Sequence, residues 1–296
     1  MVPIVAYVGQ RFPYGGGCGS SEIDLANVPI PTGQPPGVIL CTFVLAFAND
    51  LGIGDGTFQP QWDTDHYSAE NLAGVTAAIP TVNFTVSLGG GAAFWNPISS
   101  EGNFQAAWIN NAVSSITGIM QTYGLVGVDV DYEQGPDGGA LDDSFVQCMS
   151  QVILSMPNVY WSLAPFTQTL DTYLDLYDAV ADRVKPTFNF QAYSMETEDP
   201  QAYIDQYTEY INNDPRITSH GGAGIGLGID TNTNTQPTNE QRGMQYPDIT
   251  NFCLSHATNG SGTPNNLFSQ AMIWSIEDSC ANGYPVERAL LGLPPS

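Results

Sequence analysis

Eight short apolar segments recur along this chain of 296 residues, and their regular spacing most constrains its fold. Each segment is rich in residues that favour β-strands, and consecutive segments start about 38 residues apart on average. They cover residues 4–8, 38–47, 82–88, 126–131, 159–164, 187–193, 224–229 and 271–276. A unit of this length accommodates one strand, one helix and two loops, so the pattern predicts an α/β protein.

Segments with the pattern of amphipathic helices lie between several of these strands. They cover residues 68–78, 104–120, 141–154, 170–180 and 202–211. Ser68 is suited to cap the first helix, and the second places Trp108 and Ile116 near one face. No linker or shift in composition divides the chain, so we predict a single-domain (β/α)8 TIM barrel across residues 1–296.

The charge of the chain narrows its partners. Six basic residues against thirty acidic ones give a net charge of −24, because bases are depleted while acids are present in ordinary numbers. Nucleic acids and anionic membranes both require a basic surface, so neither is expected as a partner. No apolar run reaches the length of a membrane span. We expect a monomer that is secreted and binds a neutral ligand, although an acidic cytosolic protein would have a similar composition.

The cysteines and histidines give no sign of a metal site. Cys41 lies within an apolar run and is expected to be a buried free thiol. The other four cysteines could form up to two disulfides: Cys18, Cys148, Cys253 and Cys280. The histidines are isolated in the sequence, at His66, His220 and His256. We therefore predict neither a metal nor a cofactor.

The strongest chemical signal is the fourth strand segment and the two residues after it, residues 126–133. Side chains alternate along a strand, so Asp129, Asp131 and Glu133 share one face. The other face is apolar and suits packing against helices; it comprises Val126, Val128, Val130 and Tyr132. Crowded carboxyl groups raise at least one pKa, as a general acid requires, and Glu133 falls where barrel active sites lie. The alternatives are a metal site and acids that face solvent.

Several motifs resemble those of one enzyme family, in the same order along the chain. Asp129-x-Asp131-x-Glu133 resembles the DxxDxDxE signature of glycoside hydrolase family 18, which includes chitinases and endo-N-acetylglucosaminidases. Residues 87–90 resemble the SxGG motif of that family, and residues 6–10 resemble the opening of hevamine-type plant chitinases. Residues 191–193 and 272–275 are similar to the family's sixth and last strands. Val126 replaces the first Asp of the signature, and its opposite strand parity indicates a changed packing partner rather than a lost catalyst.

The resemblance implies a retaining hydrolase of β-1,4-linked N-acetylglucosamine in chitin or chitooligosaccharides, working by substrate-assisted catalysis. Glu133 would protonate the glycosidic oxygen, and Asp131 would orient the acetamido group of the substrate. Asp129 would hold a proton shared with Asp131. Tyr193 would donate its hydroxyl to the acetamido oxygen.

Substrate-binding residues are expected around these acids. By the same resemblance Trp274 would form the floor of the sugar site, since sugar rings stack on aromatic planes. Tyr7 and Phe47, on the first two strands, are further candidates. Gln191 belongs to the sixth-strand motif, and Gly90 is small enough to leave room for a sugar.

Three other tryptophans match no motif of the family resemblance. Trp62 and Trp95 follow strand segments and either line outer subsites or pack in the core. Trp108 lies in a helical pattern and is expected in the core.

Two alternatives to a chitinase stay open. An enzyme with the same mechanism would cleave the chitobiose core of N-glycans, and the loops around the cleft decide between the two substrates. An inactive chitinase-like protein would bind carbohydrate or act as an inhibitor. The presence of Glu133, Asp131 and Tyr193 argues against an inactive protein.

Overall fold

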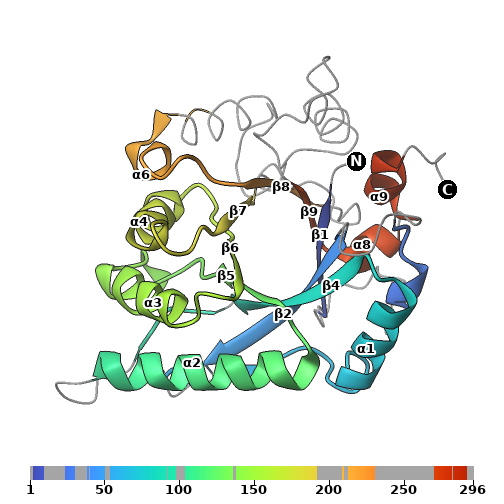
Figure 1. Ribbon diagram of the computed structural model, residues 1–296, viewed down its shortest axis with the longest axis horizontal. Helices are drawn as coiled ribbons and strands as arrows, with labels where there is room; N and C mark the ends of the chain where they lie inside the picture. Colours follow the sequence, from blue (N-terminus) through green and yellow to red (C-terminus); the bar gives the residue numbers. More distant parts are fainter. Residues whose placement is uncertain are drawn as a thin grey trace.

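The computed structural model describes residues 3–9, 24–30, 39, 41–50, 54–91, 93–97, 104–135, 138–191, 209, 213–230, 270–281 and 283–291. In this part of the chain, eight parallel strands form a closed barrel, with helices on its outside (Figure 1). The strands are β1 (Ile4–Val8), β2 (Cys41–Asp50), β4 (Val82–Gly89), β5 (Gly127–Asp131), β6 (Tyr160–Leu163), β7 (Thr187–Phe190), β8 (Ile225–Asp230) and β9 (Gln270–Trp274). β1 pairs in parallel with both β2 and β9, which closes the barrel. The predicted (β/α)8 barrel is confirmed.

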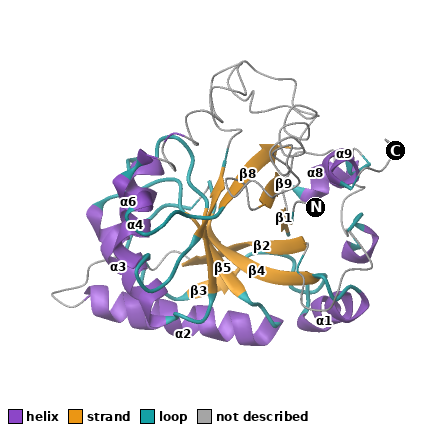
Figure 2. Cartoon of the chain, turned by 45° about the horizontal axis from the view of Figure 1, so that its top comes forward, coloured by secondary structure: helices purple, strands orange, loops and turns teal. Residues whose placement is uncertain are grey.

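The helices surround the strands, as Figure 2 shows. They are α1 (Ala69–Ala78), α2 (Phe104–Tyr123), α3 (Asp143–Ser155), α4 (Leu170–Val180), α6 (Pro215–Thr218), α8 (Ile276–Ala281) and α9 (Pro285–Leu290), with a 3-10 helix η1 (Leu25–Asn27). The Ser68 side chain accepts a hydrogen bond from the backbone N–H of Asn71, so it caps α1 as predicted. The helix predicted over residues 202–211 lies almost entirely outside the described residues.

Some elements differ from the sequence-based expectations. A short strand β3 (Phe58–Pro60) pairs antiparallel with the end of β2 and was not predicted. β9 ends at Trp274, and Ile276 begins α8 instead of ending the last strand. Elements of three to six residues, such as β3, α6, α8 and α9, are too short to show a hydrophobic period.

Two apolar clusters fill the two sides of the barrel wall. The outer cluster lies between strands and helices and contains Val128, Val130, Trp62, Trp95 and Trp108. These three tryptophans are buried in the outer core. The inner cluster comprises Val5, Tyr7, Val44, Ala46, Phe47 and Met272, with Trp274 packed against it. Val126 was expected to pack against helices, but it precedes β5 and is 46% exposed.

Among the described side chains, the apolar inner cluster comes from β1, β2 and β9. The opposite strands contribute buried polar side chains to the interior: Thr85 and Ser87 of β4, Asp129 and Asp131 of β5, Ser162 of β6 and Asn189 of β7. Alternation along each strand places these residues inward while their neighbours pack outward. The barrel interior therefore has an apolar half and a polar half, and the acids lie in the polar half.

Two of the cysteines are buried free thiols. Cys41 was predicted to be one, and the structure confirms this. Cys148 was included among the candidates for disulfides, which is wrong, because it is fully buried in α3 and unpaired. Cys18 and Cys253 lie outside the described residues. With two of five thiols free, the chain has cysteines for at most one internal disulfide instead of two.

Among the described residues, no helix is long and apolar enough to cross a lipid bilayer. Among the same residues, no group of three or more His, Cys, Asp or Glu side chains is arranged to hold a metal ion.

Candidate active site

Three carboxyl groups lie along β5 and just beyond its carboxyl end. Asp129 and Asp131 are 0% and 3% exposed, and Glu133 follows two residues beyond the strand on the same face. We call these three residues the acidic cluster. Their burial excludes the interpretation in which all of them face solvent.

Asp129 accepts hydrogen bonds from side chains of four other strands. Its Oδ2 accepts from the Tyr7 hydroxyl of β1 and the Ser87 hydroxyl of β4, each at 2.8 Å. Its Oδ1 accepts from the Ser162 hydroxyl of β6 at 2.5 Å and from the Asn189 amide of β7 at 3.2 Å. Register explains part of this set, because Ser87 and Ser162 both lie directly opposite Asp129 in the neighbouring strands. Asp129 is therefore anchored at the centre of the polar half.

Asp131 and Glu133 share a single carboxamide. The Nε2 of Gln191 donates to Asp131 Oδ1 at 2.7 Å, to Glu133 Oε1 at 3.4 Å and to the carbonyl of Ala164 at 2.9 Å. Gln191 directly follows β7 and is buried. Sequence reasoning placed Gln191 among the sugar-binding residues, and the structure places its amide against the acids.

Burial raises the pKa of all three carboxyl groups of the acidic cluster. For Asp131 the charges of Glu133 and Asp129 add to this effect, and its pKa lies well above the ordinary value. The hydrogen bonds from Ser162, Tyr7, Ser87 and Asn189 oppose the shift at Asp129. The hydrogen bond from Gln191 opposes it at Glu133. A cluster of this kind retains protons at pH values where exposed carboxyl groups are ionised, which is the property of a general acid.

Three aromatic side chains from the apolar half lie together beside this site. The ring of Trp274 stacks on that of Phe47 at a centroid distance of 5.8 Å and an interplanar angle of 25°. It also contacts Tyr7 at 5.4 Å, and the same Tyr7 donates its hydroxyl to Asp129. The Ala46–Phe47 and Trp274–Ser275 peptide bonds are both cis. The structure thus brings the predicted aromatic residues together next to the acids.

Glycines at the end of β4 bring the chain close to both groups. Gly90 has a φ of 91°, and a Cβ there would lie 2.5 Å from the Phe47 ring. Its backbone N–H donates to the carbonyl of Asp131 at 2.7 Å. A Cβ on Gly91 would lie 3.2 Å from Glu133 Oε2. Gly90 is therefore restricted to glycine by its φ and by Phe47, whereas a side chain at Gly91 would press on the end of the Glu133 side chain.

Several features of the site were not predicted from the sequence. Ser162, Asn189 and Gln270 are polar residues within strands, and that polarity is the signal that points to an inward, functional face. Tyr193, the predicted donor to the acetamido oxygen, lies outside the described residues. Residues 10–23, 192–208 and 231–269, which follow strands β1, β7 and β8, lie outside them as well.

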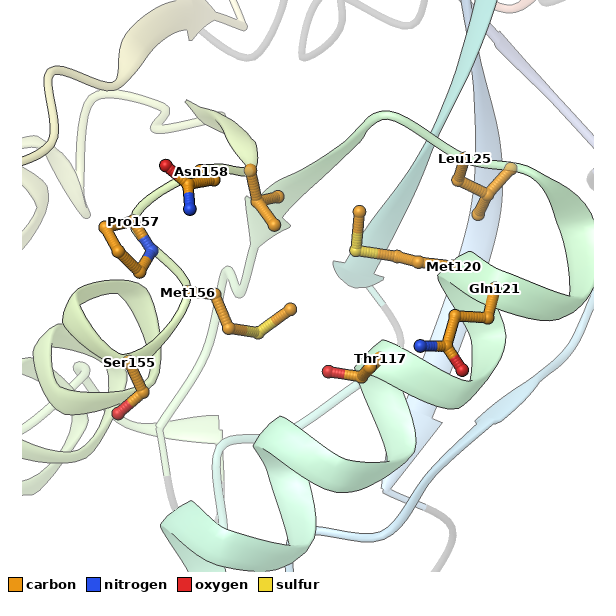
Figure 3. Close-up of a pocket in the computed structure, with 9 residues that line it drawn as sticks. Thr117, Met120, Gln121, Leu125, Ser155, Met156, Pro157 and Asn158 are labelled. Carbon is orange, nitrogen blue, oxygen red and sulfur yellow. The ribbon is translucent and has the colours of Figure 1, made fainter.

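A cavity of about 390 Å³ lies away from the acidic cluster, between the carboxyl ends of α2 and α3 (Figure 3). Its lining comprises Thr117, Met120, Gln121, Leu125, Ser155, Met156, Pro157, Asn158 and Val159. Leu125 and Val159 precede β5 and β6, so the cavity is at the amino end of the barrel. No titratable side chain lines it, and barrel active sites form at the other end, so it does not contribute to the site.

The fold and the acidic cluster together define a (β/α)8 barrel with a buried group of carboxyl side chains at the carboxyl end of β5. No family model matches the chain. A search of curated proteins finds Chitinase 1 of Tulipa saxatilis subsp. bakeri, 27% identical over 286 residues, which are 92% of this chain and 80% of that protein.

Two solved structures share the fold over nearly their whole length. The family 18 chitinase from Crocus vernus has a TM-score of 0.73 at 21% identity and covers 98% of each chain. The catalytic domain of a family GH18 chitinase from the fern Peteris ryukyuensis has a TM-score of 0.74 at 23% identity and covers 99% of each chain. The resemblance to hevamine-type chitinases of glycoside hydrolase family 18, predicted from the motifs, is confirmed.

Proposed function

We propose that this protein is a retaining glycoside hydrolase that cleaves β-1,4-linked N-acetylglucosamine in chitin or chitooligosaccharides. The observation that carries this proposal is the acidic cluster, buried at the carboxyl end of β5 with Glu133 at its outer end. The similarity to Chitinase 1 along 92% of the chain supports the same substrate class.

In this proposal two of the three acids carry the catalytic steps. Glu133 is the least buried of them and, among the described residues, has one hydrogen bond, at 3.4 Å, so it is free to give its proton to the glycosidic oxygen. Asp131 lies between Glu133 and Asp129 and is placed to hydrogen-bond the N–H of the substrate's acetamido group. The acetamido oxygen then attacks the anomeric carbon while the bond from that carbon to the protonated glycosidic oxygen breaks and the leaving sugar departs. The negative charge of the cluster stabilises the resulting oxazolinium cation, and water opens it as Glu133 takes one of the water's protons. Tyr193 would hold that oxygen during the attack.

The surroundings of the site suit a neutral sugar. Trp274 is partly exposed, stacks on the buried Phe47 and is tilted against the buried Tyr7, so its ring is supported in a position where the C–H face of a pyranose can bind. A net charge of −24 disfavours anionic polymers but leaves a neutral polysaccharide unaffected. Secretion and a monomeric state complete the proposal and agree with this substrate.

The test compares two substrates and two matched variants. The protein is incubated with chitin oligomers and with a high-mannose glycoprotein, beside Glu133→Gln and Glu287→Gln. Glu287 is also a fully buried glutamate, but it lies in α9, outside the acidic cluster. Its carboxyl group accepts hydrogen bonds from the Ser279 hydroxyl. We expect oligomer cleavage to fall at least about 100-fold in Glu133→Gln, the typical contribution of a general acid, and to persist in Glu287→Gln.

The other outcomes discriminate the alternatives. Release from the glycoprotein alone would replace chitin by the N-glycan core as the substrate. Binding of oligomers without turnover would indicate an inactive carbohydrate-binding protein. Early products with inverted anomeric configuration, read by NMR, would contradict the substrate-assisted mechanism.

A further inference from the structure

The acidic cluster is supplied with hydrogen-bond donors very unevenly. Among the described residues, Asp129 accepts from four separate side chains, whereas Asp131 and Glu133 share the one amide of Gln191. Asp129 and Asp131 are equally buried, so burial alone does not distinguish them. The difference in donors decides which carboxyl group carries the negative charge and which holds the proton.

Four donors saturate an ionised carboxylate. A carboxylate has about four lone-pair sites and no proton to give, so it accepts from Tyr7, Ser87, Ser162 and Asn189 without conflict. A protonated Asp129 would force one of these donors to turn round or lose its partner. For Ser87 and Ser162, Asp129 is the sole hydrogen-bond partner of the hydroxyl among the described residues. The arrangement therefore favours an ionised Asp129.

The donors to Oδ1 form a chain that lies outside the motifs of the family resemblance. The Ser162 hydroxyl lies 2.5 Å from Oδ1, and Ser162 is itself 2% exposed. The amide of Asn189 is oriented toward Asp129 because its own Oδ1 accepts from Gln270 Nε2 at 2.6 Å. A Cβ on Gly226 would lie 2.7 Å from Asn189 Oδ1, so the glycine makes room for this orientation. Four strands thus fix two donors on one oxygen.

We propose that Ser162, assisted by Asn189, is a positioning residue that holds Asp129 as the permanent anion of the acidic cluster and thereby keeps the mobile proton between Asp131 and Glu133. This inference rests on the proposed function and assigns a role to β6 and β7 within it. It also differs from the proton shared by Asp129 and Asp131 that the family resemblance implies.

The first test is the pH dependence of oligomer cleavage by Ser162→Ala, Ser162→Thr and Ser150→Ala. Removing the Ser162 hydroxyl makes Asp129 easier to protonate, so the acidic limb of kcat/KM should move up by about one pH unit. We expect kcat to fall about tenfold with little change in KM, and Ser162→Thr to restore both. Ser150→Ala removes another buried hydroxyl, in α3, and should leave the profile unchanged.

A second readout does not depend on activity. Carbon-13 labelling of the aspartate carboxyl groups, assigned with Asp129→Asn and Asp131→Asn, gives the order in which the two groups ionise. We expect Asp129 to ionise at the lower pH in the native protein, and the interval between the two to narrow in Ser162→Ala.

Three results would overturn the inference. They are an unmoved acidic limb in folded Ser162→Ala, a failure of Ser162→Thr to rescue, and ionisation of Asp131 before Asp129. A loss of thermal stability without any change in the pH profile would reduce Ser162 to a structural role. If the native protein cleaves neither substrate while the NMR order holds, the proposed function fails and the assignment of the anion survives.

Discussion

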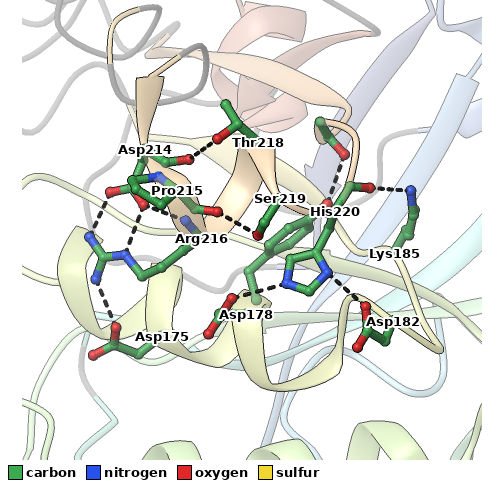
Figure 4. A network of polar contacts seen from close by, with 12 residues as sticks. Asp175, Asp178, Asp182, Lys185, Asp214, Pro215, Arg216, Thr218, Ser219 and His220 are labelled. Atoms are coloured by element: carbon green, nitrogen blue, oxygen red, sulfur yellow. Dashed lines mark hydrogen bonds and ion pairs between the residues drawn. The ribbon is translucent and has the colours of Figure 1, made fainter.

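Two groups of aspartates in this molecule have opposite surroundings. The acidic cluster lies inside the barrel, and a second group, the aspartate row, lies on α4 and just beyond it at Asp171, Asp175, Asp178 and Asp182. The spacing of three or four residues places the row on one helical face, where it meets α6 and His220 (Figure 4).

The aspartate row is paired with two basic side chains. Arg216 of α6 contacts Asp175 at 2.7 Å and Asp171 at 3.0 Å, and it also contacts Asp214 at 2.7 Å. His220 lies 3.0 Å from Asp178 and 2.9 Å from Asp182. In a chain with only six lysines and arginines, this use of Arg216 relieves repulsion that would otherwise destabilise the helix.

The acidic cluster has neutral donors instead of cations among the described residues. The difference in partners is visible in two pKa values. The hydrogen bond from Arg216 lowers the pKa of Asp214, which lies beside the row, while burial and neighbouring carboxyl groups raise that of Asp131. Carboxylates that serve stability are paired with cations, and carboxyl groups that must hold a proton are kept away from them.

The largest expected effect is a difference in catalytic activity between variants of the acidic cluster and variants of the aspartate row. Asp131→Asn removes the group that we propose orients the acetamido nitrogen, and it should lower kcat/KM on chitin oligomers by about 100- to 1,000-fold. Asp175→Asn makes the same chemical change in the aspartate row and should leave kcat/KM within about twofold. Steady-state kinetics of both variants checks this, and equal losses would show that the distinction between the groups is wrong.

Arg216 should matter for stability and not for chemistry. Arg216→Ala leaves three carboxylates without their cation and should lower the free energy of unfolding by about 1–2 kcal/mol, a few tenths to one for each pair. Urea unfolding measures this, with Arg288→Ala as the control. A stability loss that vanishes in high salt would fit the expectation, whereas a changed KM would contradict it.

The fold was predictable because its signal is repeated. Each strand segment is apolar and β-rich, and the strands found lie within a few residues of the predicted ones. The face shared by Asp129, Asp131 and Glu133 was also readable, since alternation is a local property of one strand.

Side-chain contacts between strands that are distant in the sequence could not be predicted. Ser162 and Asn189 bond Asp129 across 33 and 60 residues, and barrel closure brings them together rather than any local pattern. The same reason applies to Gln191, whose amide contacts the acids, and to Trp62 and Trp95, which pack in the outer core. A polar residue within an apolar strand is the remaining sequence signal. It indicates a buried polar position but does not identify the hydrogen-bond partner of that side chain.

The acidic cluster should cost stability at neutral pH. Folding raises the pKa of Asp131 above its unfolded value, so the folded state holds the proton more tightly and stability falls as pH rises between the two values. Asp131→Asn should therefore be more stable than the native protein at pH 7, by about 1 kcal/mol, and the gain should shrink toward pH 4. Thermal unfolding at both values measures the difference, and a gain that is constant with pH would contradict this origin.

The smallest expected effect concerns His220. As at Asp131, its contribution to stability decreases as pH rises, but the cause is its pairing with aspartates. Hydrogen bonding to Asp178 and Asp182 raises the pKa of His220, so its stabilising contribution is complete below the ordinary histidine value and is lost as pH rises through the raised one. The ring also meets Tyr177, and Lys185 donates to the His220 carbonyl, which adds a like charge nearby. His220→Gln should lower Tm at pH 5 and match the native protein at pH 9. A Tm difference that persists at pH 9 would assign the contribution of His220 to packing instead of charge.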